Sequence, residues 1–517
     1  MFITPTILIW LLTIGLIAYR CHRSLFDRPK NFPSGPPKLP FLGGYAIMLL
    51  LNYRHLHKAA NQLCSFYKTK MLGIYLADFP AVIVNDHALV KEVQTRVEFD
   101  GRPDLFLARL REKNFKLRGI FFTQGSDWKE QRRFILRHQR DYGFGRRFDE
   151  LEAETNSEIL TLIEMLRYGP KYAHEEEFMT KDGYVMCPNV FFACFANAFL
   201  HVLSGERINR EDAAVLIETG KFALTFQRTT DDYGTINSLR PWVRHIFPNL
   251  TKYRTIREAS LGVNRFIESV IQKRLETHEE GHERCFLDLY FNKMKKTIPR
   301  DEDDRFTFQH DQLVLGIVDF FFPAISGATV QIALLLERLL WHPEVVRKMQ
   351  GEIDDVVGHG RLPSLDDRIN LPYTEATLRE GMRIDTLVPS GIAHMATQDT
   401  TLSGYDIPKD TVLLLGLDYI HMQKDVWGDP ENFRPERFLD HQGKLSLAKD
   451  VSVPFGAGKR LCAGETFARN TMFLIVSALV QNFNLKQRPG EKLPDLGKRL
   501  TGVIISPPDY WIRFEPR

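Results

Sequence analysis

One long apolar stretch constrains the fold of this chain more than any other feature. Residues 308–341 consist largely of Leu, Ile, Val, Phe and Ala with few charges, and the stretch is longer than most globular helices. Asp311 marks its start, and His342 with Pro343 marks its end. A helix that is apolar on most faces must be surrounded by other elements, so this stretch predicts a buried central helix.

The remaining chain predicts further helices and a few short strands. Residues 343–358 and 371–384 show the periodicity of amphipathic helices, whereas residues 391–416 are rich in Thr, Val, Leu and turn residues typical of strands. A length of 517 residues would allow several domains, but we find no flexible linker, low-complexity tract or internal repeat. We therefore expect one large domain over residues 45–517, mainly α with a small β region.

The charge balance and the cysteines exclude several classes of protein. The 68 basic and 65 acidic residues give a net charge of +3, which argues against a nucleic-acid-binding protein. The six cysteines form neither a CxxC pair nor a regular framework. This usage is typical of reduced thiols in contact with the cytosol.

The N-terminal residues predict a membrane anchor. Residues 2–19 carry no charge, and at about 1.5 Å per residue they nearly span a hydrocarbon core of about 30 Å. Arg20, Arg23, Arg28 and Lys30 follow, which favours a cytosolic location for the rest of the chain. A cleaved signal peptide is the alternative, but a basic first region and a small-x-small cleavage site are lacking. We expect an anchor helix over residues 1–20 and a basic, proline-rich hinge over residues 21–44.

A glycine-rich loop around Cys462 is the most specific motif. The segment is Phe455-Gly-Ala-Gly-Lys-Arg-Leu-Cys-Ala-Gly, and a predicted helix follows it. Backbone N–H groups and the positive end of a helix dipole would lower the pKa of this thiol and favour a thiolate, either as nucleophile or as metal ligand. A buried core cysteine is the alternative. The three glycines and the adjacent Lys459 and Arg460 argue against it.

This decamer matches the haem-binding signature of the cytochrome P-450 superfamily, Phe-x-x-Gly-x-Arg-x-Cys-x-Gly, at every fixed position. The chain resembles in particular the animal microsomal type that hydroxylates drugs and steroids. The resemblance implies the cytochrome P-450 fold and haem b bound by the loop that begins at Phe455. It also implies Cys462 as the axial iron ligand and Arg460 as a partner of a haem propionate. A cysteine thiolate pushes electron density onto the iron and favours O–O cleavage.

Two charged motifs follow in the order found in that family. Glu380 and Arg383 are three residues apart, so they share one helical face, and taken alone they would form a solvated surface ion pair. Downstream lies Pro435-Glu-Arg-Phe438. By resemblance, Glu380, Arg383 and Arg437 form a buried structural triad.

Three further residues are implied as propionate contacts. Trp128 and Arg132 are four residues apart, again on one helical face, and the family's Trp-x-x-x-Arg motif contacts a propionate. His394 stands where relatives hold another such contact. The alternatives are a packed tryptophan, an exposed arginine and a core histidine.

The central helix departs from the family pattern. Counting from Asp319 to His342 without a gap places Ser326 where the family has an acid and Gly327 where it has a threonine. The acid and the alcohol normally hold water and deliver protons during oxygen activation, which glycine cannot do. Ser326 and Thr329 are therefore our candidates for a proton relay. Pro323, in the same segment, removes one helical N–H.

The resemblance implies a monooxygenase that inserts one oxygen atom from O2 into a small lipophilic substrate, either steroid- or hormone-like or a xenobiotic. Electrons would come from NADPH through a flavoprotein reductase, with cytochrome b5 as an additional partner. The expected location is the endoplasmic reticulum membrane, with the catalytic domain on the cytosolic side. Because of Ser326 and Gly327, two alternatives stay open: an isomerase or dehydratase that needs no O2 activation, and a non-catalytic haem or ligand binder.

His278-Glu-Glu-Gly-His282 fits the zinc-protease pattern H-E-x-x-H. The surrounding residues are charged on all sides and offer no apolar face to bury a metal. We therefore expect a solvated loop or helix end at this motif.

Overall fold

The computed structural model describes residues 28–297, 308–448 and 450–517. It also describes six helical positions of the predicted anchor, which are Trp10, Leu12, Thr13, Gly15, Leu16 and Tyr19. The remainder of residues 1–20, and the hinge up to residue 27, lie outside the described residues. From residue 28 to residue 44 the predicted hinge contains neither helix nor strand.

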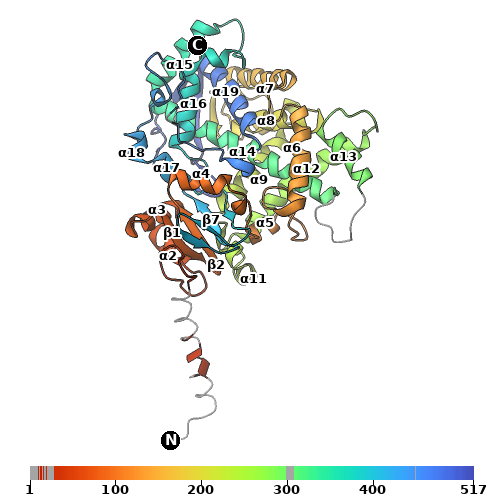
Figure 1. Cartoon of the computed structure of the whole chain (residues 1–517). Coiled ribbons are helices and arrows are strands. Elements are labelled where there is room, and N and C mark those ends of the chain that lie inside the picture. The colour runs from red at the N-terminus through yellow and green to blue at the C-terminus, as the bar shows by residue number, and fades with distance from the viewer. Residues whose placement is uncertain are drawn as a thin grey trace.

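Helices dominate the described chain and strands are few and short (Figure 1), which confirms the predicted mainly α fold with a small β region. The helices are α2 (Tyr45–Asn52), α3 (Leu56–Phe66), α4 (His87–Thr95), α5 (Phe106–Arg109), α6 (Gly125–Asp141), α7 (Asp149–Tyr168), α8 (Phe192–Ser204), α9 (Ala214–Thr229), α10 (Thr235–Leu239), α11 (Val243–Ile246), α12 (Tyr253–Glu276), α13 (Phe286–Lys296), α14 (His310–Trp341), α15 (Pro343–Val356), α16 (Pro372–Ile384), α17 (Leu417–His421), α18 (Lys424–Trp427) and α19 (Glu465–Asn482). The strands are β1 (Met71–Leu76), β2 (Phe79–Val84), β3 (Tyr184–Cys187), β4 (His394–Met395), β5 (Thr400–Leu402), β6 (Tyr405–Ile407), β7 (Val412–Leu415), β8 (Phe483–Gln487), β9 (Leu500–Thr501), β10 (Ile505–Ser506) and β11 (Tyr510–Pro516).

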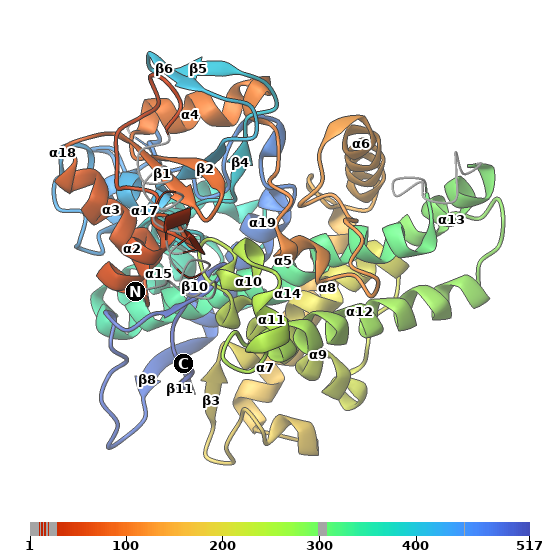
Figure 2. The same ribbon diagram turned by 90° about the horizontal axis from the view of Figure 1, so that it is seen from below.

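Helix α14 is the predicted central helix. It packs against α8, α9, α12, α16 and α19, and Figure 2 shows it in the interior among the other helices. The helix is long and apolar enough to cross a membrane, yet 94% of its most apolar stretch is buried inside the protein. It begins at His310, two residues later than expected, and continues through Pro323 to Trp341. Burial on nearly all faces explains why the sequence lacks a polar face here.

A four-stranded sheet lies near the N-terminal end of the described chain, in the order β1-β2-β7-β4. Strands β1 and β2 are antiparallel, and β2 runs parallel to β7. Strand β4 pairs with β7 through His394 opposite Leu413. The segment at residues 391–416 thus supplies β4 to β7, as its composition predicted. The sheet carries His394 to the edge of the helical body.

The hydrophobic core has one large cluster around α14, two smaller ones on the sheet and a fourth that contains Ala376, Trp427 and Phe438. The large cluster contains buried residues from Phe106 to Phe514, so segments far apart in the sequence share it. The second cluster packs α2 and α3 on β1 and β2. This continuity supports the single large domain expected from the sequence.

Candidate functional site

The cysteine loop is held in a tight conformation before α19. A 3₁₀ turn covers Gly458–Arg460, and the N–H of Cys462 donates to the carbonyl of Phe455 over 2.9 Å. Gly458 has a φ of +67°, and a Cβ there would lie 2.0 Å from the carbonyl oxygen of Gln94. Both the backbone conformation and the close approach to α4 therefore require glycine.

Cys462 differs from the other cysteines of the described chain, because its side chain is exposed whereas theirs are buried. The residue is solvent-accessible, yet burial of the thiol by the surrounding protein raises its pKa. The backbone N–H of Gly464 and the charges of Arg132 and Arg469 lower this pKa. The expected lowering of the thiol pKa is therefore wrong for the protein alone, since burial outweighs the loop and helix. A bound metal ion would deprotonate the thiol directly.

Trp128 and Arg460 form a stacked pair beside the loop. The Arg460 guanidinium lies 3.5 Å from the centre of the Trp128 ring. It also donates to the carbonyl oxygens of Asp100 and Thr123, at distances of 2.7–2.9 Å. Trp128 is buried, and its indole Nε1 has no hydrogen-bond partner in the described protein. The structure thus brings together two of the residues selected from the sequence.

Arg132, one turn after Trp128 on α6, reaches the same loop. Its Nη2 donates to the carbonyl of Leu461 over 2.8 Å, immediately before Cys462. Burial lowers the pKa of Arg132, and the nearby Cys462 raises it. The spacing of four therefore places both side chains of the Trp-x-x-x-Arg motif next to the cysteine loop, and their contact with a propionate stays a prediction.

Arg102 belongs to this cluster and was missed by the sequence reasoning. It is buried, and its Nη1 donates to the carbonyl of Ala393 over 2.9 Å. Burial, followed by Arg132, lowers the pKa of Arg102 to about 9. Burial, followed by Arg102 and Arg132, lowers the pKa of Arg460 to about 8. One signal was available in the sequence, because Arg102 stands between a glycine and a proline that restrict the backbone.

His394 lies at the edge of the arginine cluster. Its Nδ1 is 2.8 Å from the carbonyl oxygen of Phe99, so Nδ1 carries the proton and donates. Burial, followed by Arg102, lowers the pKa of His394 to about 3. The side chain is thus a neutral imidazole near Arg102 and Arg460.

The cluster fits a ligand that carries carboxylates. Besides burial, Arg132 lowers the pKa of Arg102, and Arg102 and Arg132 lower that of Arg460, while Asp100 compensates both groups only in part. A partnerless indole N–H lies among them. Buried cations of this kind are stable when an anion pairs with them. The two propionates of haem, beside the exposed residue Cys462, meet this requirement.

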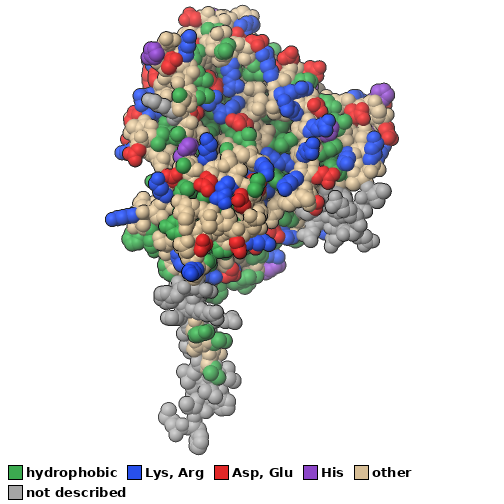
Figure 3. Space-filling view, in the orientation of Figure 1, with side chains coloured by type: hydrophobic (Ala, Val, Ile, Leu, Met, Phe, Trp, Pro, Cys, Tyr) green, Lys and Arg blue, Asp and Glu red, His purple; other side chains and the backbone are tan. Residues whose placement is uncertain are grey.

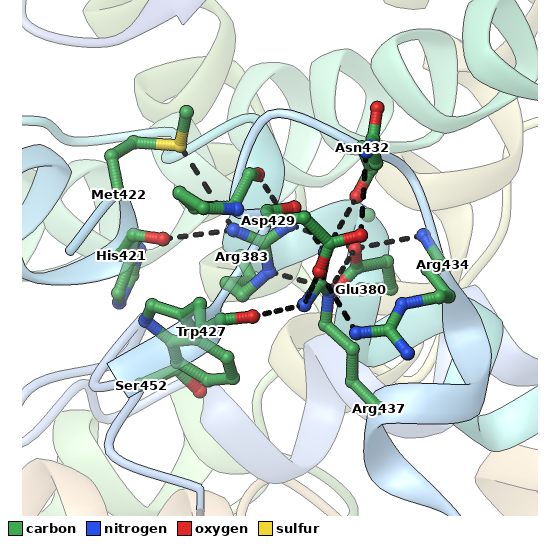
Figure 4. A network of polar contacts seen from close by, with 12 residues as sticks. Glu380, Arg383, His421, Met422, Trp427, Asp429, Asn432, Arg434, Arg437 and Ser452 are labelled. Atoms are coloured by element: carbon green, nitrogen blue, oxygen red, sulfur yellow. Dashed lines mark hydrogen bonds and ion pairs between the residues drawn. The ribbon is translucent and has the colours of Figure 1, made fainter. Parts of the chain in front are cut away.

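The predicted charged triad is fully formed (Figure 4). Arg383 donates from Nε and Nη2 to both carboxylate oxygens of Glu380 over 2.7 Å. Arg437 donates from Nε to Glu380 over 3.2 Å. Glu380 and Arg383 have no exposed surface, so the surface ion pair considered as an alternative is wrong. The free donors of Arg383 bind the carbonyls of His421 and Pro430, which ties α16 to the segment before the cysteine loop.

The hydroxyls of Ser326 and Thr329 bond back to the backbone of the central helix. Ser326 Oγ donates to the carbonyl of Phe322 over 2.7 Å, and Thr329 Oγ1 donates to that of Ile325 over 2.9 Å. Both side chains are fully buried, whereas Pro323, three residues before Ser326, is exposed. Both hydroxyls therefore bond within the helix, and the predicted relay stays a prediction.

The two histidines of the H-E-x-x-H segment have different surroundings. His278 Nδ1 is 3.3 Å from Asp288 Oδ1 and Nε2 is 3.0 Å from Asn292 Oδ1, while His282 is exposed. No group of three metal-ligating side chains occurs in the described ranges. The expected solvated loop is wrong for His278, because this ring is buried against α13.

A pocket lies between the four-stranded sheet and the segments around α5 and α10. Most of its wall is apolar, and its lining includes Leu76, Phe79, Leu105, Phe122, Val412 and Leu414. Arg102 also lines it. The pocket therefore adjoins the arginine cluster on the side of the sheet.

Comparison with known proteins agrees with this site. The sequence matches the cytochrome P450 family over residues 33–514. It is 30% identical to the farnesoate epoxidase of Bombyx mori over 502 residues, which cover 97% of this chain and 96% of that relative. It is 30% identical to cytochrome P450 2E1 of Oryctolagus cuniculus, over 100% of this chain and 99% of that relative. It is 29% identical to cytochrome P450 2J2 of Homo sapiens, over 98% of this chain and 96% of that relative. The chain therefore belongs to the cytochrome P450 family and is a haem b-dependent oxidoreductase of the monooxygenase type.

Proposed function

We propose that this protein inserts one oxygen atom from O2 into a small lipophilic substrate, at a haem whose iron is bound by Cys462. The observation that carries this proposal is the exposed residue Cys462 beside Arg102, Arg132 and Arg460, of which Arg102 is buried and the other two are half-buried. Asp100 compensates the charges of Arg102 and Arg460 only in part. When bound, the haem supplies the chemistry of oxygen activation. The protein would supply the thiolate and the counter-charges for the propionates.

We assign the other site residues as follows. Arg102, Arg132 and Arg460 pair with the propionates, and Trp128 offers its indole N–H to one of them. His394 supports this cluster at the edge of the sheet, and Phe455 begins the loop that presents Cys462. Glu380, Arg383 and Arg437 have a structural role, because they contact neither the loop cysteine nor the arginine cluster.

Spectroscopy of the reduced protein with carbon monoxide tests the iron ligand. We expect the wild-type protein to give the spectrum characteristic of thiolate ligation, and Cys462→Ser to lose it together with turnover. Cys64→Ser is the matched control, because Cys64 is buried in the cluster on the sheet. A thiolate-type spectrum that survives in Cys462→Ser would disprove the assignment.

The substrate we propose is steroid- or hormone-like or a xenobiotic. The pocket next to Arg102 is mostly apolar, although Asp231 and Asp232 also line it, and its volume of about 60 Å³ accommodates only part of such a molecule. One relative is named for its action on farnesoate, which is a lipophilic acid. Turnover with NADPH and reductase against a panel of steroids, terpenoid acids and xenobiotics tests the substrate class. Activity restricted to hydrophilic compounds would contradict it.

Proton delivery is proposed through Ser326 and Thr329. Each hydroxyl would have to exchange its acceptor within the helix for a water or substrate atom. Ser326→Ala and Thr329→Ala should then lower the product formed per NADPH consumed. Unchanged coupling in both variants would remove them from the relay.

A second candidate function is isomerisation or dehydration without O2 activation. Gly327 in place of the family threonine, together with the internally bonded hydroxyls, favours it. Product formation from a peroxide substrate in the absence of O2, NADPH and reductase would support this candidate. Strict dependence on all three would support the monooxygenase.

We also propose a membrane anchor at residues 1–20, a hinge at residues 21–44 and the catalytic domain at residues 45–517, facing the cytosol at the endoplasmic reticulum. The electron donor would be an NADPH-dependent flavoprotein reductase, with cytochrome b5 as a further partner.

Exposed apolar side chains on α2, α11 and the flanking segments support contact with lipid, namely Phe41, Leu50, Trp242, Ile246, Phe247 and Leu250. Arg240 Nε donates to the carbonyl of Phe41, so the two groups of side chains are neighbours. Hydrophobic side chains are visible in Figure 3 where the body meets the N-terminal segment.

A further inference from the structure

A second polar network leads from the charged triad to the cysteine loop through His421. This residue ends α17, is fully buried and has no part in the roles assigned above. We infer that His421 is a positioning residue, which fixes the segment approaching Cys462 by accepting the backbone N–H of Val453. The inference rests on the proposed function, because it concerns the geometry of the proposed iron ligand.

The hydrogen bonds define one tautomer of His421. The N–H of Val453 donates to Nε2 over 3.1 Å, so Nε2 carries no proton. The proton is then on Nδ1, which lies 2.7 Å from Thr386 Oγ1 and donates to it. The hydroxyl of Thr386 in turn donates to the carbonyl of Arg383 over 3.1 Å. Every polar atom of this chain thus has a partner of the right kind.

His421 is itself held by the triad. Nη1 of Arg383 donates to the His421 carbonyl over 2.8 Å, and Glu380 fixes Arg383 from the other side (Figure 4). The indole of Trp427 donates to the carbonyl of Ile420 over 3.0 Å, which fixes the preceding residue. The position of the imidazole is therefore set by α16 and Trp427 rather than by the loop that it contacts.

Val453 stands at the entrance to the cysteine loop. Its carbonyl accepts the N–H of Gly456 over 3.0 Å, and the carbonyl of the intervening Phe455 accepts the N–H of Cys462 over 2.9 Å. A displacement of Val453 therefore moves Phe455 and, through that hydrogen bond, Cys462. Among the described residues, His421 is the side chain that links this turn to the triad.

The ring has to stay neutral for this role, because an imidazolium would present a second donor to the N–H of Val453. Burial, followed by the charge of Arg383, lowers the pKa of His421 to about 3. The acceptor at Nε2 is thus retained throughout the physiological range.

Two substitutions of His421 test the acceptor at Nε2 separately from the rest of the side chain. In His421→Asn the short amide reaches the position of Nδ1 and leaves Val453 without an acceptor, whereas in His421→Gln the amide oxygen reaches the position of Nε2. In the haem-loaded protein we expect hydrogen exchange at the Val453 amide to become about tenfold faster in His421→Asn. We also expect this variant to lose part of the thiolate-type carbon monoxide spectrum, and His421→Gln to restore both properties.

Thr386 provides a second pair of variants. Thr386→Val removes the partner that fixes the tautomer and should also accelerate exchange at Val453, whereas Thr386→Ser keeps the hydroxyl and should behave like the wild type. Wild-type exchange and an unchanged spectrum in His421→Asn would overturn the inference. If His421→Asn does not fold, wild-type exchange in Thr386→Val would overturn it equally. A wild-type protein without the thiolate-type spectrum would instead overturn the proposed function.

Discussion

Arg383 is the largest side chain that is fully buried in the described protein. A guanidinium in this position is stable only because every face meets an acceptor. The carboxylate of Glu380 and the carbonyls of His421 and Pro430 supply these acceptors. Removal of one partner of such a pair leaves the other charge uncompensated in a region of low dielectric.

We therefore predict that Arg383→Leu lowers the free energy of unfolding by about 3–5 kcal/mol. The matched control is Arg434→Ala, since the Arg434 side chain is half exposed and its ion pair with Asp429 is worth about 0–1 kcal/mol. Urea unfolding of the haem-loaded protein measures both. Equal midpoints for Arg383→Leu and the wild type would refute the prediction.

At this scale the sequence predicted the residues that belong to short, fixed-spacing motifs. Cys462, Arg460 and the Trp128–Arg132 pair were found because each motif lies on one loop or one helical face. The triad was found from two such motifs, Glu380 with Arg383 on α16 and Pro435–Phe438 downstream. Arg102 and His421 were not found, because folding brings them to partners far away in the chain. Arg102 meets Arg460, and His421 meets Val453 and Thr386, so no local pattern marks them.

At the scale of elements, α14 combines a proline and a glycine in a buried helix. A Cβ added to Gly327 would have Leu387 and Pro323 as its nearest neighbours, at 3.8 and 3.9 Å. The position therefore has room for a side chain, although the helix there is closely packed elsewhere. Glycine at this site is not required by packing.

We predict that Gly327→Ala stabilises the protein by about 1 kcal/mol, which is the difference in helix propensity between the two residues. Gly316→Ala on the same helix is the control, because its Cβ would lie 3.2 Å from Cδ1 of Ile135 and part of the gain would be lost. Thermal unfolding of both variants measures the difference. A lower melting temperature for Gly327→Ala than for Gly316→Ala would contradict the packing argument.

The position of α14 and the strands at residues 391–416 could be predicted, because hydropathy and composition dominate there. The direction of the Ser326 and Thr329 hydroxyls could not. Each has a choice between a carbonyl four residues earlier and an external partner, and only the packing around the helix decides between them.

At the scale of the whole molecule, buried neutral histidines make stability depend on pH. His394 and His421 have pKa values of about 3 in the folded protein, near Arg102 and Arg383 respectively, and of about 6.5 when unfolded. Between these values the unfolded chain binds more protons than the folded one. The contribution of these two histidines to the free energy of unfolding is therefore fully present above pH 6.5 and is lost as the pH falls towards 3.

For each histidine we predict a loss of about 1.4 kcal/mol per pH unit within that window. His421→Gln should reduce the slope of the unfolding free energy between pH 6 and pH 4 by about that amount. Urea unfolding at a series of pH values measures the slope. An identical slope for the variant and the wild type would show that His421 does not contribute.

The burial of α14 also bears on how the chain is made. When a segment of this hydropathy leaves a ribosome beside a lipid bilayer, its insertion into the bilayer competes with its folding into the protein. Of the five helices that pack against it, α16 and α19 are translated later, whereas α8, α9 and α12 are translated earlier. Their apolar faces are therefore ready to capture the segment as it is synthesised. The order of these helices along the chain thus also reduces mis-insertion of α14 during translation.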